Sequence, residues 1–174
     1  MDFLIIGGDA AGMSAASRAK RLKPDLKVTV LEQTQDVSYS ACGMPYNIAE
    51  PGRPIDDLVV RPAEVFRSKQ KIDLRLGHTA TRIDTAARIV HAATPHGLNA
   101  KIHYDRLLIA TGARPLRPEI PGIDQPGIFA LKTLADGRRL KAYLRDQKVA
   151  KVVIIGMGYI ALEMCEALIQ RGIK

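Results

Sequence analysis

The first residue that could do chemistry is a cysteine shortly before a proline. Cys42 precedes Pro45, and proline suits the first turn of a helix because its nitrogen has no hydrogen to leave unpaired. We therefore expect Cys42 at a helix N-terminus, where the dipole favours the thiolate. Such a thiolate can form a mixed disulfide, a sulfenic acid or a persulfide; the alternative is a small buried hydrophobic side chain. Cys165 shares a predicted helical face with Leu162, Leu168 and Ile169, which predicts core packing.

Two glycine-rich turns, each directly after a short apolar run, suit the binding of dinucleotides. A G-x-G-x-x-G turn between strand and helix lets the backbone approach a pyrophosphate and points helix amides at it. Residues 156–161 have this pattern with alanine at the third position, whereas residues 7–12 carry Asp9 at the second glycine position. Glu32 lies 25 residues past the first glycine, where a carboxylate can accept hydrogen bonds from a ribose. We expect two dinucleotide sites; plain tight turns are the alternative.

The hydrophobic pattern predicts the strands and helices that place these motifs. Residues 3–32 form one βαβ unit, with a buried strand, an alanine-rich helix and a second parallel strand that ends on Glu32. The other predicted elements are helices over 62–71, 134–144 and 159–169, strands over 107–110 and 151–155, and a β-meander over 78–83, 88–92 and 100–104. Prolines and glycines over 113–127 indicate a linker.

The second strand–turn–helix unit repeats the first one. Residues 4–7 and 153–156 both lead from an apolar run into a glycine turn and then into an alanine-bearing helix. The sequence ends at Lys174, where the next strand of the second unit is expected to begin. A unit without that strand would leave a sheet edge uncovered, so we expect the second unit to be truncated.

Composition narrows the class of protein. The chain has 174 residues with 26 Lys+Arg, 18 Asp+Glu, 47% apolar residues and a net charge of +8, as in many soluble proteins. No apolar run reaches the roughly 18 residues of a membrane span, and no signal peptide is recognisable. Two cysteines do not make a disulfide framework, so we expect a cytoplasmic protein. Aromatic residues amount to 5% and no nucleic-acid signature occurs, so nucleic-acid binding is not expected.

On these motifs the chain resembles the pyridine nucleotide-disulfide oxidoreductases, flavoproteins with two dinucleotide sites. The segment Ala110–Pro115 is similar to their second flavin-contact motif, and the resemblance covers the whole chain in the family's order. It implies an α/β fold with a Rossmann-like FAD domain over 1–114 that includes the β-meander. A linker over 115–127 and the start of a Rossmann NAD(P)H domain over 128–174 would follow.

The resemblance also implies a role for individual residues. The first turn would hold FAD, and the second NADH or NADPH. Tyr159 resembles a gate over the flavin, and Glu163 a carboxylate near the nicotinamide pocket; helix packing and capping are the alternatives. The implied FAD contacts are Gly7, Gly8, Ala11, Gly12, Glu32, Ala80, Thr111 and Gly112. The implied NAD(P)H contacts are Gly156, Gly158, Tyr159, Ile160 and Glu163.

The residues around Cys42 resemble the single-cysteine members of the family. Neither the C-x-x-x-x-C nor the C-x-x-C pair of other members occurs here. The segment 38–48 is instead similar to coenzyme A-disulfide reductases, and related NADH oxidases, peroxidases and persulfide reductases also use one cysteine there. It departs at Ala41, where coenzyme A-disulfide reductases usually have an asparagine that contacts substrate.

A basic helical face is the predicted substrate contact. Ser14, Arg18 and Arg21 fall at i, i+4 and i+7, and two guanidiniums suit phosphate oxygens. The resemblance implies that this face and Ser38 hold the nucleotide of coenzyme A. A solvated surface is the alternative.

The resemblance thus implies an FAD-dependent NAD(P)H:disulfide oxidoreductase with Cys42 as its redox residue. The substrate would be a small disulfide, such as coenzyme A disulfide, or a persulfide, and the enzyme would be a homodimer. One alternative is an NADH oxidase or peroxidase with a Cys42 sulfenic acid. Another is a truncated nucleotide-binding fragment without catalysis, and we expect these 174 residues alone to be inactive.

Overall fold

The computed structural model describes residues 1–174, and the chain folds as two units. Unit 1 comprises Met1–Tyr39 and Val59–Ala113, and unit 2 comprises Ser40–Leu58 and Arg114–Lys174. The segment Ser40–Leu58, which carries Cys42, therefore belongs to unit 2, although the family resemblance grouped it with residues 1–114. The biological domain boundaries stay a prediction.

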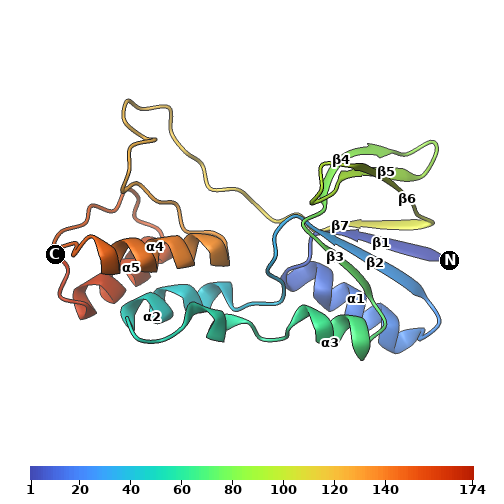
Figure 1. Ribbon diagram of the computed structural model, residues 1–174, viewed down its shortest axis with the longest axis horizontal. Coiled ribbons are helices and arrows are strands. Elements are labelled where there is room, and N and C mark those ends of the chain that lie inside the picture. The colour runs from blue at the N-terminus through green and yellow to red at the C-terminus, as the bar shows by residue number, and fades with distance from the viewer. The chain divides into compact units, whose positions relative to one another are not determined.

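Unit 1 is built on a four-stranded parallel sheet with the order β3-β2-β1-β7 (Figure 1). Its strands are β1 (Asp2–Ile6), β2 (Lys27–Glu32), β3 (Asp73–Leu76) and β7 (Arg106–Ile109). Helices α1 (Ala10–Leu22) and α3 (Ala63–Ser68) lie on one face of the sheet. The antiparallel meander β4 (Thr79–Asp84), β5 (Ile89–Ala93) and β6 (Asn99–His103) lies on the other. The predicted Rossmann-like βαβ unit and meander are confirmed.

Alternate residues of β1 enter two hydrophobic clusters, one on each face of the sheet. Ile5 packs with Met13 and Phe66 on the helix side, whereas Leu4 packs with Val90 on the meander side. Both faces are buried, which explains why β1 and β2 consist of nearly continuous apolar runs.

Strand β3 is the element of unit 1 that the sequence pattern missed. Its four residues include Asp73 and Arg75, whose side chains form an ion pair of 2.6 Å. Short, charged strands are common at sheet edges because charge discourages pairing with other chains. That same charge hid the strand from a search for apolar runs.

Unit 2 consists mainly of helices around a small core. Its elements are the 3-10 turns η1 (Ala41–Gly43) and η2 (Ile55–Leu58) and the helices α2 (Met44–Ala49), α4 (Leu134–Asp146) and α5 (Tyr159–Gln170). Ile48 of α2 is fully buried between Leu144 and Met164. No helix of either unit is long and apolar enough to cross a membrane.

The strand predicted over residues 151–155 is wrong. No strand forms there; the only ladder-like bonds run from Val152 N to Lys174 O, 2.7 Å, and from Lys174 N to Ala150 O, 3.0 Å. Val153 and Ile155 are each 78% exposed. An apolar run becomes a strand only when a neighbouring backbone pairs with it, and unit 2 contains no strand that could do so.

Candidate functional site

The first glycine turn has a geometry that requires glycine at two positions. Gly7 follows β1 with φ of +110°, and an added Cβ there would lie 2.2 Å from the carbonyl oxygen of Ala110. A Cβ on Gly12 would lie 1.8 Å from the carbonyl oxygen of Gly7. The turn thus brings helix α1 and the end of β7 against the same short backbone stretch. Ala11 is exposed in the first turn of α1.

The first glycine turn lies at the carboxyl edge of the sheet, at the point where neighbouring strands are reached by connections that run to opposite sides of β1. From β1 the chain passes through α1 to β2 on one side, while β7 pairs with β1 on the other side. Ligands of open α/β sheets bind at such a switch point. Thr111 and Gly112 follow β7 there and are exposed, and Ala80 is half-buried on β4.

Glu32 ends β2 beside this turn with its carboxylate held in place. Only 8% of the residue is exposed. Its Oε2 accepts a hydrogen bond from Gly8 N, 2.7 Å, and its Oε1 accepts from Thr34 N, 2.7 Å, and Thr34 Oγ1, 2.8 Å. A carboxylate accepts about four hydrogen bonds, so capacity remains for a ribose hydroxyl. The sequence analysis missed Thr34. A hydroxyl residue two positions after the carboxylate of Glu32 could have indicated this contact.

The second glycine turn has a similar backbone conformation, but the space around the Cβ positions of its glycines is open. Gly156 has φ of +119°, and no atom lies within 4 Å of an added Cβ on Gly156 or Gly158. Tyr159 and Ile160 begin α5 and are exposed, and Glu163 is half-buried one turn later. Gly156, Gly158 and Ile160 also line a largely apolar cavity of about 770 Å³ within unit 2. The structure therefore gathers all five predicted residues on one turn and helix.

Cys42 lies in η1, and α2 follows directly with Pro45 as its second residue. The predicted position at the start of a helix is confirmed. The thiol is free and exposed, which contradicts the alternative of a buried hydrophobic side chain. Ser38, in unit 1, has φ of +50°, and its carbonyl oxygen accepts a hydrogen bond from Val60 N, 2.8 Å.

The predicted core position of Cys165 is wrong, because this thiol is also exposed. The buried face of α5 consists of Met164, Ala167 and Leu168. Leu162 and Ile169 are exposed together with Cys165. The periodicity correctly predicted a helix. Its buried face is the one that contains Met164 and Leu168, because Ile48 and Leu144 pack against that face.

The basic face of α1 is open to solvent. Ser14, Arg18 and Arg21 are exposed, while the buried side of the helix includes Met13 and Ala16. Neither guanidinium forms a hydrogen bond or ion pair within the chain. Both are therefore available to an anionic ligand, which is compatible with the predicted substrate contact and with a solvated surface.

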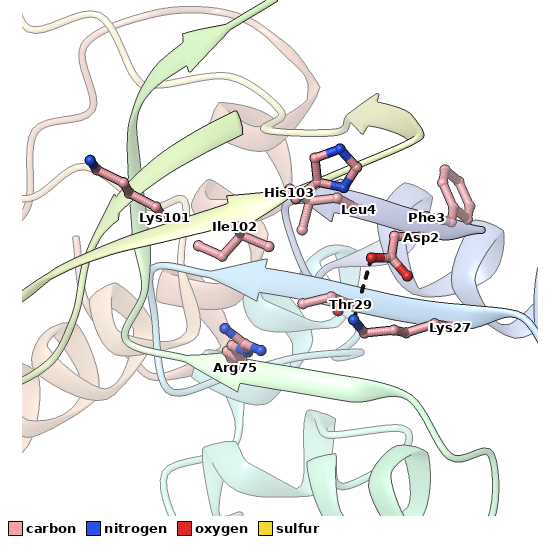
Figure 2. A pocket seen from close by; sticks show the side chains of 9 residues that line it. All are labelled: Asp2, Phe3, Leu4, Lys27, Thr29, Arg75, Lys101, Ile102 and His103. Carbon is pink, nitrogen blue, oxygen red and sulfur yellow. Dashed lines mark hydrogen bonds and ion pairs between the residues drawn. The ribbon is translucent and has the colours of Figure 1, made fainter. Parts of the chain in front are cut away.

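A separate small cavity lies at the opposite, amino edge of the sheet (Figure 2). Its volume is about 200 Å³, and Lys27 and Asp2 form an ion pair of 3.3 Å at its wall. Lys101 extends away from the other lining side chains (Figure 2). This cavity is not part of the site at the carboxyl edge.

The chain is similar to known proteins along its whole length. The family described as pyridine nucleotide-disulphide oxidoreductase matches residues 1–174. An NAD(P)H sulfur oxidoreductase (CoA-dependent) of Pyrococcus furiosus is 45% identical over 169 residues, 97% of this chain and 37% of that protein. An NADH oxidase of Methanocaldococcus jannaschii is 32% identical over 99% of this chain and 39% of that protein.

The fold also matches a solved structure. An NAD-dependent persulfide reductase from A. fulgidus is 34% identical with a TM-score of 0.93, over 99% of this chain and 33% of that one. The chain thus spans well under half the length of the relatives it matches.

Proposed function

The chain belongs to the pyridine nucleotide-disulphide oxidoreductase family. On this premise we propose that it functions in an FAD-dependent NAD(P)H oxidoreductase that reduces sulfur compounds through Cys42. The observation that carries the proposal is the free, exposed thiol of Cys42 at the start of α2. The relatives from Pyrococcus furiosus and A. fulgidus, whose names refer to sulfur and persulfide, support this class of substrate.

The two glycine turns suit the two dinucleotides. At the first turn, Gly7 and Gly12 leave no room for a Cβ, so the backbone can approach a pyrophosphate, and Glu32 can receive the ribose of FAD. Thr111 and Gly112 would then lie near the flavin. At the second turn, Gly156 and the residues that begin α5 would hold NADH or NADPH. FAD supplies the transfer of two electrons between nicotinamide and sulfur.

Cys42 would perform the sulfur chemistry by thiol–disulfide exchange. Its thiolate attacks one sulfur of a disulfide RSSR, a Cys42–sulfur bond forms, and the other half leaves as RS⁻ and takes up a proton. Two electrons from NAD(P)H then break this mixed disulfide, which releases the second thiol and restores Cys42. The sum is NAD(P)H, H⁺ and RSSR going to NAD(P)⁺ and two RSH. A persulfide substrate follows the same balance and yields a thiol and H₂S.

An anionic small disulfide suits the free guanidiniums of α1. Arg18 and Arg21 have no partner in the chain, and Ser14 lies on the same exposed face. Together with Ser38 they would contact the phosphates of coenzyme A disulfide. We propose a cytoplasmic homodimer with this small-molecule partner rather than a nucleic acid or a membrane, on the family resemblance.

The substrate test compares electron acceptors in the full-length protein. We expect NAD(P)H oxidation with coenzyme A disulfide to yield two thiols per nucleotide. Replacing Arg18 and Arg21 together by alanine should raise the KM for coenzyme A disulfide about tenfold, because charge-assisted hydrogen bonds to phosphate are lost. Reduction of bis(2-hydroxyethyl) disulfide, which is uncharged, should not change, and Lys69→Ala, an exposed cation elsewhere in unit 1, is the matched control.

Two outcomes would contradict this assignment. Equal KM effects on both disulfides would give the arginines a folding role instead. Rapid oxygen consumption without disulfide reduction would favour an NADH oxidase, as the Methanocaldococcus jannaschii relative is called.

Glu32→Ala should weaken both FAD binding and the fold. The substitution leaves Gly8 N and Thr34 N without their acceptor, which costs about 2 kcal/mol or more of unfolding free energy. FAD affinity should fall at least about tenfold, because the ribose also loses a charged acceptor. Urea unfolding and flavin titration measure the two effects, with Gln33→Ala, the exposed neighbour, as control. An unchanged flavin affinity would remove Glu32 from the FAD site.

A further inference from the structure

A cluster of hydrogen bonds in unit 2 converges on the ammonium group of Lys141, whose side chain is half-buried. This residue of α4 donates to Asn47 O at 2.8 Å, Asn47 Oδ1 at 2.7 Å, Glu50 O at 2.9 Å and Arg53 O at 2.6 Å. An ammonium has three hydrogens, so every donor is engaged and one is shared. All four acceptors belong to α2 and the loop that follows it, which is the segment that carries Cys42.

The acceptors include backbone oxygens at the carboxyl end of α2, where Asn47 O also accepts a hydrogen bond from Glu50 N at 3.2 Å. The last carbonyl groups of a helix have no partner within the helix, and cations near them stabilise it. Lys141 contacts Asn47 O, and Arg171, just past α5, donates from Nη1 to Ile48 O at 2.9 Å. Asn47 is fully buried and also donates from Nδ2 to Pro54 O at 2.9 Å. Two cations from distant parts of unit 2 thus cap one six-residue helix.

Helix α4 contacts the same segment at two further points. An added Cβ on Gly137 would lie 2.5 Å from Ile55 Cδ1 and 3.5 Å from Met44 Sδ, so these two side chains pack directly on the backbone of α4. One turn of α4 therefore presents a close contact at Gly137, an ion pair from Arg138 to Asp56, and the Lys141 cluster. The isolated α2 is too short to be stable alone, so its place depends on these contacts.

We propose that Lys141 is a positioning residue for the redox cysteine, because its ammonium holds α2, and α2 continues directly from the turn that contains Cys42. The inference rests on the proposed function only in giving Cys42 a redox role. Burial, followed by repulsion from Arg171, lowers the pKa of Lys141. Glu50 and Asp57 oppose this effect, and Arg53 adds to it. Partial burial and the neighbouring Arg171 thus disfavour the charged form of Lys141. The four oxygen acceptors around its ammonium group offset this cost.

The test uses Lys141→Met, which keeps the chain length and removes the charge, in the full-length protein. We expect the backbone amides of residues 46–50 to exchange hydrogen about tenfold faster, because α2 loses charge-assisted hydrogen bonds. Alkylation of Cys42 at neutral pH, measured by mass spectrometry relative to Cys165 in the same molecule, should slow by about threefold or more. The kcat for disulfide reduction should fall about tenfold with the KM for NAD(P)H unchanged.

Lys141→Arg is the rescue variant and Lys148→Met the control. A guanidinium still donates several hydrogen bonds, so Lys141→Arg should recover kcat to within about threefold of the original. Lys148 is exposed and without a side-chain partner, so its variant should behave as the original. If Lys141→Met does not fold, Arg171→Met, which loses one bond to Ile48 O, should show the same changes with smaller size.

The proposal is overturned if folded Lys141→Met or Arg171→Met keeps the original ratio of Cys42 to Cys165 alkylation, even where thermal stability falls. It is also overturned if Lys141→Arg is as impaired as Lys141→Met, since the positive charge would then have no role. Retained disulfide reduction in Cys42→Ser is a separate result. That result would contradict the proposed function, while the alkylation ratio would still decide the role of Lys141.

Discussion

Cys42→Ser is expected to lower kcat for disulfide reduction by at least about a thousandfold, with FAD and NAD(P)H still bound. The serine hydroxyl is not a nucleophile at neutral pH without a base, and it cannot form the mixed disulfide that divides the reaction into two steps. Losses of this size are usual when a covalent nucleophile is removed. The exposed position of Cys42 means that the exchange of sulfur for oxygen should leave packing intact.

Stopped-flow and steady-state measurements on the full-length protein, with coenzyme A disulfide as the acceptor, provide the comparison. Cys165→Ser is the matched control, because Cys165 is the other free, exposed thiol and lies on α5. That variant should keep normal turnover. A kcat of Cys42→Ser within about tenfold of the original would contradict the single-cysteine mechanism. Loss of the nucleophile should lower kcat about a thousandfold.

Gly12→Ala is expected to abolish FAD binding at the first glycine turn. It should also lower the unfolding free energy of unit 1 by about 3 kcal/mol or more. The new Cβ would lie 1.8 Å from the carbonyl oxygen of Gly7 and 3.2 Å from Ile5 Cγ2. Backbone cannot yield as a flexible side chain does, so α1 must move away from β1. Helix propensity alone would favour alanine by about 1 kcal/mol, so a loss of stability isolates the clash.

Gly158→Ala provides the contrast within the same chain. Gly158 precedes α5 with φ of −78°, and no atom lies within 4 Å of its added Cβ. We expect the unfolding free energy of this variant to change by less than about 0.5 kcal/mol. Urea unfolding and flavin content are the measurements. A Gly12→Ala protein with normal stability and normal flavin content would show that α1 and β1 pack less tightly than the structure indicates.

Much of unit 1 could be predicted because its signals are local. Continuous apolar runs indicated β1 and β2, and short segments separated by turn residues indicated the meander. The glycines between β1 and α1 indicated a turn that only glycine permits. Cys42 was placed correctly because Pro45 signals a helix start. Each of these inferences needed fewer than about 20 consecutive residues, the range over which periodicity acts.

The sequence by itself determined the two glycine turns, the carboxylate at the end of β2 and the place of Cys42 directly before α2, since each depends on neighbours along the chain. Only the tertiary structure decided which apolar segments found partners. Charged β3 became a strand because β2 pairs with it, whereas residues 151–155 stayed irregular for lack of a paired strand. The outward turn of Cys165 and the capping of α2 by Lys141 likewise depend on contacts between distant segments. Such contacts are set by which surfaces exclude water together, and local periodicity carries no record of them.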